Sequence, residues 1–300
     1  MRQIHLIAAF AAAFLLSAPI IPAQAGAVLD RIVERKTIRF GYRTDAPPFS
    51  FTADGRPQGF TTELCGVMAG AVMATSDLRE ITGTFKAVDT ATRFDALTSG
   101  QIDVLCGATT ATLKRREAMS FTIPIFATGV GAVVSSDAPE LMQEVLIDGG
   151  PAALSGAAIR EALGGKRLGV RASTTAEEWL RQSAIAKIEG VEIVPIGDHA
   201  EGLAGVAEGN LEAYFADRAI LAGVLARVAD ADRFALSRNT FTFEPYALAI
   251  PRGDEDLRLV LDRALSHVYR SGAIFQIFER HFGKPGANEI LFYGITALPE

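Results

Sequence analysis

The sequence lacks the short motifs that mark the common catalytic and cofactor sites. It contains no Gly-x-Ser-x-Gly segment, no Walker phosphate loop and no Gly-x-Gly-x-x-Gly fingerprint. Its histidines, His5, His199, His267 and His281, show no His-x-x-x-His spacing, and no paired cysteine ligands stand near them. We therefore expect neither a metal site nor a cofactor, and we favour a binding protein over an enzyme.

The sequence also lacks an excess of basic residues. Its formal net charge is -6 at pH 7, whereas a protein that binds nucleic acid needs a basic surface to neutralise phosphates. Nucleic acid is therefore not an expected partner. Any site for an anion must be built locally, from a few well-placed cations.

Long apolar runs are absent except at the N-terminus. Arg2 gives a positive start, an apolar stretch covers Ile4–Leu16, and residues 23–25 (Ala-Gln-Ala) give the small-x-small pattern of a signal-peptidase site. Pro19 and Pro22 interrupt the run and no stop-transfer cluster of charges follows, which argues against the alternative of a transmembrane anchor. We predict cleavage after residue 25, a periplasmic destination and no stable insertion in the membrane.

The rest of the chain alternates helix-like and strand-like segments, as α/β proteins do. A chain of 300 residues is long for one compact core, so two lobes are expected. A further helix is expected to begin with Thr61 or Thr62 as its N-cap. The other predicted helices cover 28–36, 93–99, 175–182, 199–207, 254–271 and 273–281, and the main predicted strands cover 37–42, 102–106, 166–170, 191–196, 211–216 and 246–250.

Only two cysteines, Cys65 and Cys106, follow the predicted cleavage site. A small, even number of cysteines in an exported protein favours a disulfide, because that compartment is oxidising. The alternative is two buried free thiols, since the sequence does not give the distance between their Cα atoms.

Arginines and hydroxyl residues gather at the predicted strand-to-helix turns. Guanidinium groups bind carboxylates through two parallel hydrogen bonds, and hydroxyls and N–H groups at helix starts take the remaining lone pairs. Taken singly, each such residue is more often a surface charge or a helix cap, so the hypothesis requires that they meet in one place. The set is Arg43, Thr90, Arg93, Thr109, Thr110, Arg115, Thr174 and Thr175.

An acidic residue stands at a similar turn. Asp217 directly follows the strand-like segment 213–216 and is the candidate partner for an ammonium group. The alternative is an ordinary N-cap of the helix that follows it.

One stretch of the sequence carries a family resemblance. Gly100–Thr110, continued by Thr112, Arg115 and Phe121-Thr122-x-Pro124, is similar to the pattern G-x-x-D-x-x-x-G-x-T-x-T-x-x-R and F-S-x-P of the polar amino-acid family of bacterial extracellular solute-binding proteins. The likeness extends over nearly the whole chain after the signal peptide. Further landmarks in the same order are Pro48–Phe51, Gly59-Phe60, Ser173–Thr175 and Tyr214–Asp217.

The resemblance implies the two-lobed periplasmic binding protein type II fold, in which each lobe is a sheet flanked by helices and the ligand lies in the cleft between lobes. Two crossing strands would join the lobes, and both ends of the chain would form the first lobe. We accordingly predict a signal peptide over 1–25, the first part of lobe 1 over 26–131, lobe 2 over 132–246, and a return to lobe 1 with the C-terminal helices over 247–300.

The resemblance also implies roles for individual residues. Arg115 would clamp the α-carboxylate of a free amino acid, with help from Thr110 and the region of Thr174. Asp217 would accept hydrogen bonds from the α-ammonium group. Phe49 or Phe51 would form an aromatic wall of the site, of which Phe51 is the one we select.

The sequence is most similar to the glutamate/aspartate-binding branch of this family. In that branch a second carboxylate would be received by Arg43, by Thr90 with Arg93, and by His199 after Asp198. Two cations near the side-chain end require that this end of the ligand be anionic or strongly polar, because leaving a buried guanidinium unpaired costs about 3–5 kcal/mol, and we favour an acidic ligand. Ala108 departs from the branch, which tends to place serine there, and the stretch 148–165 is longer than in the family.

The resemblance leaves two other functions open. One is an enzyme on the same fold, such as a periplasmic cyclohexadienyl dehydratase, since fold does not determine function. The other is a protein that reports its ligand to a membrane sensor. We favour a monomer that captures an amino acid and delivers it to the inner-membrane permease of an ABC transporter.

Overall fold

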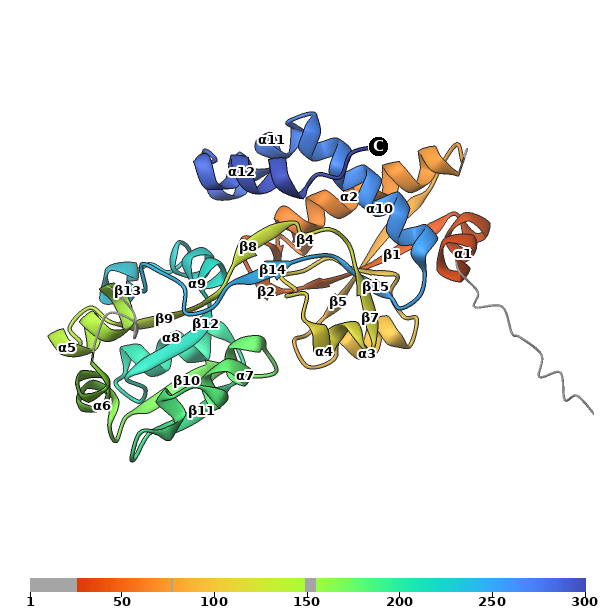
Figure 1. The fold of residues 1–300 in the computed structure, drawn as a ribbon. Coiled ribbons are helices and arrows are strands. Elements are labelled where there is room, and N and C mark those ends of the chain that lie inside the picture. Colours follow the sequence, from red (N-terminus) through yellow and green to blue (C-terminus); the bar gives the residue numbers. More distant parts are fainter. Residues whose placement is uncertain (1–25, 77, 149–154) are drawn as a thin grey trace, which may run out of the picture.

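Two five-stranded sheets organise the chain in the computed structural model, which describes residues 26–76, 78–148 and 155–300 (Figure 1). The predicted signal peptide, residues 1–25, lies outside the described residues, as does part of the long stretch 148–165. The expectation of two α/β halves is confirmed, and each half has its own sheet and its own buried clusters.

The first sheet combines strands from both ends of the chain. β1 runs parallel to β5 and β6, whereas β15 runs antiparallel to β6 and β7. Apolar residues are buried on both faces, with α2 and α10 covering one face and α3 the other. In spatial order the strands are β5 (Thr82–Val88), β1 (Thr37–Arg43), β6 (Val104–Leu105), β15 (Ala249–Pro251) and β7 (Met119–Phe121). The helices are α1 (Ala27–Arg35), α2 (Phe60–Thr75), α3 (Arg93–Thr98), α4 (Leu113–Arg116), α10 (Glu255–Arg270), α11 (Ala273–Phe282) and α12 (Ala287–Thr296).

The second sheet comes from the middle of the chain. β10 runs parallel to β11 and β12, and β9 runs antiparallel to β12 and β13. Buried clusters again lie on both faces, one involving α5 to α7 and the other α8 and α9. In spatial order the strands are β11 (Glu192–Ile196), β10 (Arg167–Arg171), β12 (Ala213–Asp217), β9 (Val130–Ser135) and β13 (Phe234–Leu236). The helices are α5 (Glu140–Gln143), the π-helix Glu144–Asp148, α6 (Gly156–Leu163), α7 (Thr175–Gln182), α8 (His199–Ala207) and α9 (Arg218–Leu225), with short 3-10 turns at Ile185–Lys187 and Ala231–Arg233.

Two antiparallel strands pass between the halves. β8 (Phe126–Thr128) pairs with β14 (Glu244–Tyr246), and both run from one sheet towards the other in Figure 1. Gly129, which follows β8, lies very close to the backbone of Thr242. A Cβ at Gly129 would lie 1.9 Å from the carbonyl oxygen of Thr242. Only glycine fits at this crossing. The predicted lobe boundaries stay predictions; 131 falls within β9 and 246 is the last residue of β14.

A small three-stranded sheet precedes α2. It consists of β2 (Asp45–Ala46), β3 (Ser50–Ala53) and β4 (Arg56–Gln58).

The predicted N-cap of α2 is wrong. Thr61 and Thr62 do not cap α2; their hydroxyls lie inside the first turn and donate to the carbonyl oxygens of Phe49 and Gly59, at 2.7 and 2.8 Å. Gly59 is the residue before the helix, with φ +126°, and a Cβ there would meet the Phe49 carbonyl at 2.3 Å.

Most other predicted elements are present, with two corrections at the C-terminal end. The strand expected over 246–250 is divided, because β14 ends at Tyr246 in the crossing pair and β15 begins at Ala249 in the first sheet. Two C-terminal helices were expected, but a third, α12, follows them. Gly283 to Gly286 separate α11 from α12, so the helical pattern restarts after a break.

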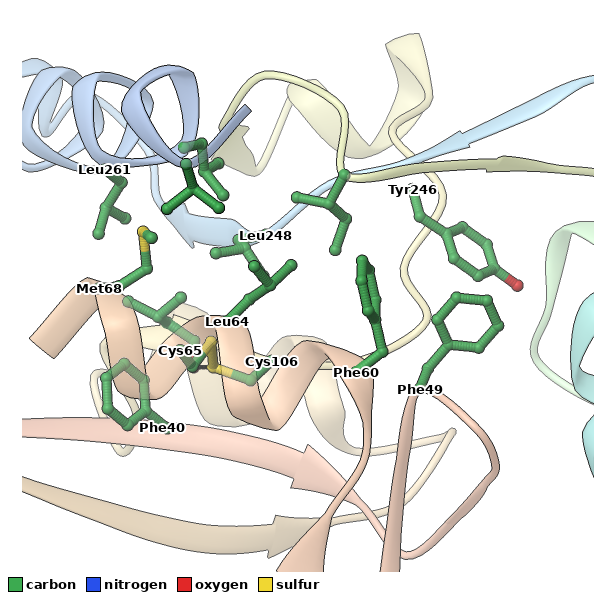
Figure 2. Packing of buried hydrophobic residues seen from close by; sticks show 14 of the residues in the cluster. Phe40, Phe49, Phe60, Leu64, Cys65, Met68, Cys106, Tyr246, Leu248 and Leu261 are labelled. Atoms are coloured by element: carbon green, nitrogen blue, oxygen red, sulfur yellow. Dashed lines mark hydrogen bonds between the residues drawn. A yellow bond between two sulfur atoms is a disulfide. The ribbon is translucent and has the colours of Figure 1, made fainter. Parts of the chain in front are cut away.

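A disulfide cross-links two elements in the core of the first half. Cys65 on α2 is bonded to Cys106, which follows β6, and both are fully buried. Their Cα atoms lie 6.3 Å apart, which is within the range that a disulfide spans. Figure 2 shows the bond among Leu64, Met68 and Leu248, with Phe49 and Phe60 farther along the same cluster. The predicted disulfide is therefore confirmed.

The disulfide should contribute substantially to stability. It closes a loop with a sequence separation of 41 residues, for which the loss of chain entropy in the unfolded state corresponds to about 4 kcal/mol. We expect the double variant Cys65→Ser, Cys106→Ser to lose about 2–5 kcal/mol of unfolding free energy in urea. Dithiothreitol should lower the stability of the parent and leave that of the double variant unchanged; equal sensitivity of both proteins would contradict the assignment.

Candidate functional site

A cavity between the two halves collects most of the predicted site residues. Its lining comes from the first sheet, from the second sheet and from β14, so both halves contribute walls. Eight of the eleven predicted ligand contacts line it, namely Arg43, Arg93, Thr110, Arg115, Thr174, Thr175, His199 and Asp217. Their roles towards a ligand stay predictions, but the structure brings them together.

The positions of these residues follow from the topology of parallel strands. Arg43 is the last residue of β1 and Asp217 the last of β12, while Arg93, Thr175 and His199 are the first residues of α3, α7 and α8. Carboxyl ends of parallel strands meet at one edge of a sheet, where helix N-termini present unpaired N–H groups. Two such edges face each other here, and an anionic or zwitterionic solute suits the space between them.

One end of the cavity is rich in buried positive charge. The guanidinium groups of Arg43, Arg93 and Arg171 are all buried there, and the carboxylate of Asp45 pairs with two of them, Arg43 and Arg171. Arg43 Nε donates to Asp45 Oδ1 at 2.9 Å and Arg171 Nη2 donates to Asp45 Oδ2 at 2.8 Å. Burial by itself would raise the pKa of Asp45, but Arg43 and Arg171 outweigh it and lower that pKa to about 2.

Several donors at this end have no acceptor within the described part of the chain. They are Nε and Nη1 of Arg93, Nε of Arg171 and Nε2 of His199, whereas Nη2 of Arg43 lies 2.8 Å from Asp45 Oδ1 in an ion pair of poor hydrogen-bond geometry. Burial, and then the charge of Arg43, lower the pKa of Arg93 to about 8. A buried donor left without a partner costs about 1–3 kcal/mol. At this end of the cavity, donors therefore outnumber acceptors and positive charges outnumber negative ones.

His199 is held as a neutral donor. Burial and the charge of Arg43 lower the pKa of His199 to about 3, so its ring is uncharged at neutral pH. Its Nδ1 lies 3.0 Å from the hydroxyl of Tyr214, whose own pKa is raised by burial. Because that hydroxyl keeps its proton and donates it to Nδ1, we assign the ring proton to Nε2. Nε2 is then a hydrogen-bond donor to whatever enters this end of the cavity.

The other end of the cavity combines a cation with acidic groups. Arg115 Nη1 donates to the carbonyl oxygen of Thr110 at 2.8 Å. The ring of Phe94 lies against two guanidinium carbons, that of Arg93 at 4.1 Å and that of Arg115 at 4.9 Å from its centroid. The aromatic ring holds both cations by cation–π contact while keeping them apart. Arg115 is thus fixed by the backbone and by Phe94.

Asp217 caps the helix that follows it and also lines the cavity. Its Oδ1 caps α9 by accepting from the N–H groups of Ala219 and Ile220 at 2.9 and 3.1 Å. Its Oδ2 is buried and makes no hydrogen bond of good geometry among the described residues. Burial raises the pKa of Asp217 to about 7, a hydrogen-bonding interaction with the Tyr246 hydroxyl opposes this rise, and the nearby carboxylate of Glu244 adds to it. One oxygen is therefore structural, and the carboxylate lines the cavity beside Tyr246.

Three predicted contacts do not line this cavity. Phe51 packs under Arg227, whose guanidinium carbon lies 4.0 Å from the ring centroid, and Phe49 belongs to the aromatic core with Phe60 and Tyr246. Thr90 lies behind the cationic end, where its hydroxyl accepts from Arg171 at 2.9 Å. Thr109 is buried, and its hydroxyl has no partner in the described residues. An aromatic wall from Phe49 or Phe51 is not seen, since both rings are used in packing.

The sequence analysis missed Arg171, Glu244 and Tyr246, which also line the cavity. Arg171 is the last residue of β10, so the strand-end rule that selected Arg43 would have found it. Glu244 and Tyr246 lie on the short crossing strand β14, where no periodic pattern marks the site. Glu244 Oε2 accepts from the hydroxyls of Thr110 at 2.7 Å and Thr175 at 2.6 Å. It thereby joins both halves to the crossing strand.

The fold and this cavity together define a two-lobed binding protein, with a solute site between two α/β halves. Residues 38–284 match the family model of bacterial extracellular solute-binding proteins, family 3. The chain belongs to this family, which confirms the resemblance. No helix within residues 26–76, 78–148 and 155–300 is long and apolar enough to cross a membrane.

Curated relatives cover nearly the whole chain. An L-glutamate/L-aspartate-binding protein of Pseudomonas aeruginosa is 28% identical over 275 residues, covering 91% of this chain and 85% of the relative. An L-cystine-binding protein of Escherichia coli is 24% identical, covering 85% of this chain and 86% of the relative. Among solved structures, an ancestral amino-acid-binding protein described as a precursor of cyclohexadienyl dehydratase shares the fold, with a TM-score of 0.67 at 23% identity over 85% of this chain and 98% of that one.

A glycine allows the two halves to touch beside the cavity. Gly223 on α9 packs against Pro47 and Pro48 of the first half; a Cβ there would lie 2.4 Å from the Pro47 carbonyl oxygen and 2.5 Å from the Pro48 Cδ. Ile220 on the same helix belongs to the buried cluster of the first half. The contact between α9 and the first half therefore depends on a missing side chain.

We expect Gly223→Val to hinder the approach of the two halves, because its clash with backbone atoms is not relieved by a rotamer change. Overpacking costs about 1–3 kcal/mol, so solute affinity in calorimetry should fall roughly tenfold. Small-angle scattering with saturating solute should give a larger radius of gyration than for the parent. Gly70→Val on α2, where the added side chain meets open space, is the matched control; identical behaviour of the two variants would argue against the contact.

Proposed function

We propose that this protein captures a free acidic amino acid, glutamate or aspartate, in the periplasm for the inner-membrane permease of an ABC transporter. Membership of the family supports solute capture outside the cytoplasm. The names of the relatives support an amino acid, and one of them binds glutamate and aspartate. The observation that carries the acidic specificity is the surplus of buried positive charge at one end of the cavity.

The charge balance at one end of the cavity favours a ligand with an anionic side chain. Three guanidinium groups lie there, those of Arg43, Arg93 and Arg171, and Asp45 is the carboxylate paired with two of them. With these four groups ionised, that end holds two positive charges in excess. The side-chain carboxylate of glutamate or aspartate, which is ionised at neutral pH, would offset part of this excess, whereas a neutral side chain would leave all of it.

The two ends of the cavity suit the two ends of such a ligand. Arg115 would receive the α-carboxylate, and the carboxylate of Asp217 would accept from the α-ammonium group. Arg43, with the donors of Arg93 and His199 that lack partners, would receive the side-chain carboxylate. Because these groups come from both halves, a bound ligand favours the closed arrangement, and hinge closure is well established for periplasmic binding proteins.

The geometry of His199 favours binding over dehydratase chemistry. A general base works best with a pKa near the operating pH, whereas that of His199 is lowered to about 3. With Nδ1 occupied by Tyr214, the ring offers an N–H donor to an anion. Turnover of arogenate by the purified protein would overturn this view.

A thermal-shift screen across the free amino acids tests the proposed function. A ligand that binds only the folded protein raises its stability by about 2.7 kcal/mol at a concentration of 100 times Kd, so glutamate or aspartate should raise the melting temperature most. A larger shift with glutamine, cystine or arginine would reject acidic specificity. No shift with any amino acid would reject amino-acid capture.

Arg115→Met and Asp217→Asn should each weaken glutamate binding at least tenfold in calorimetry. Each substitution removes one charge-assisted hydrogen bond, worth about 1.5–3 kcal/mol. Arg116→Met, at an exposed position on the same helix, and Asp198→Asn, which neutralises the comparable N-cap of α8 but keeps a capping oxygen, are matched controls that should bind as the parent does. Parent-like affinity in either test variant would refute its assigned contact.

Binding should weaken as the pH falls through about 7. The pKa of Asp217 is about 7 in the protein, and a ligand ammonium group beside Oδ2 would lower it. Full affinity is therefore present above pH 7, and below it the affinity should fall by up to tenfold per pH unit, since the carboxyl must first lose its proton. Calorimetry between pH 8 and pH 5.5 measures the slope, which Asp217→Asn should abolish; a flat profile in the parent would count against the Asp217 contact.

A further inference from the structure

Arg171 is a buried cation that crosses from the second half to the first. It ends β10, and its Nη2 donates to Asp45 Oδ2 at 2.8 Å and to the Thr90 hydroxyl at 2.9 Å. Both acceptors belong to the first half. On its own side, Nη1 donates to the carbonyl oxygen of Ile196 at 3.3 Å. The guanidinium group is therefore held from two sides and has little freedom to turn.

The remaining edge of this guanidinium is available to a ligand. Arg171 lines the cavity, and its buried Nε has no partner among the described residues. The guanidinium of Arg43 and the unpaired Nε2 of His199 belong to the same lining. Arg43 comes from the first half, whereas Arg171 and His199 come from the second. An anionic group at this end of the cavity would accept from both halves at once.

The charges around Arg171 indicate that this residue distinguishes ligands by their charge and not by their shape. Asp45 is shared between Arg43 and Arg171, so one carboxylate faces two guanidinium groups, with Arg93 adding a third. A neutral amide in the ligand would fill the same space as a carboxylate and leave this surplus in place. The penalty for leaving buried charge without a partner falls on the neutral ligand.

We propose that Arg171 is a specificity-determining residue, which contacts the side-chain anion of the ligand from the second half and thereby discriminates glutamate from glutamine. This inference rests on the proposed function, because it presumes an acidic amino acid in the cavity. It assigns to the second half a cation that completes the site formed by Arg43 and Arg93.

The test compares two ligands of nearly equal shape. The parent and Arg171→Met are titrated with glutamate and with glutamine in a calorimeter at pH 8. We expect Arg171→Met to weaken glutamate binding at least tenfold and glutamine binding less than threefold, so that the ratio of the two affinities collapses. Arg167→Met, which removes an exposed arginine at the other end of β10 paired with Glu192, is the matched control and should keep the parental ratio.

Arg171→Lys is a second variant that distinguishes the loss of a ligand contact from a folding defect in Arg171→Met. It keeps the positive charge but loses the forked geometry, so it should retain more of the glutamate preference than Arg171→Met. If both variants lose affinity for glutamate and for glutamine equally, Arg171 is a structural residue and the inference is overturned. An unchanged ratio of the two affinities in Arg171→Met would also overturn it. If the parent binds neither glutamate nor aspartate, the proposed function fails and this inference falls with it; if the parent binds and the ratio persists in Arg171→Met, only this inference fails.

Discussion

The buried surplus of positive charge between the two sheets is the constraint on which the rest of this structure depends. Arg43 and Arg171 share the carboxylate of Asp45. N–H groups of the nearby Arg93 and of Arg171, together with Nε2 of His199, have no acceptor in the described chain. Such an arrangement is costly in isolation. A buried set of cations of this kind is stable when an anionic ligand supplies the missing acceptors. For that reason the charge pattern gives more information about function than the shape of the cavity does.

The surrounding fold positions these charges rigidly. Each arginine at the cationic end stands at the end of a strand or the start of a helix, where buried sheets fix the backbone. Neighbouring side chains then fix the guanidinium groups themselves, through Asp45, Thr90 and the ring of Phe94. Preorganised donors bind an anion without the cost of ordering long flexible side chains at the moment of binding.

Close backbone packing lets the two halves meet around the site. Gly129 permits the crossing strands to pass, and Gly223 permits α9 to lie against Pro47 and Pro48. Glu244, on the crossing strand β14, accepts from a threonine of each half. The same residues that join the halves therefore also line or flank the cavity, which links capture of a solute to the relative position of the two sheets.

The sequence by itself determined the fold class and the family, favoured the disulfide and predicted eight residues of the cavity lining. It did so because hydrophobic periodicity reports elements directly, because the Gly100–Thr110 pattern is specific, and because strand-end residues converge in any parallel sheet. Only the tertiary structure decided how Phe51, Thr90 and Thr109 are used, that Thr61 and Thr62 lie inside α2, and that Arg171 and Glu244 reach the cavity. These outcomes depend on contacts between segments far apart in the chain, such as Arg171 with Asp45, and no local pattern encodes such contacts.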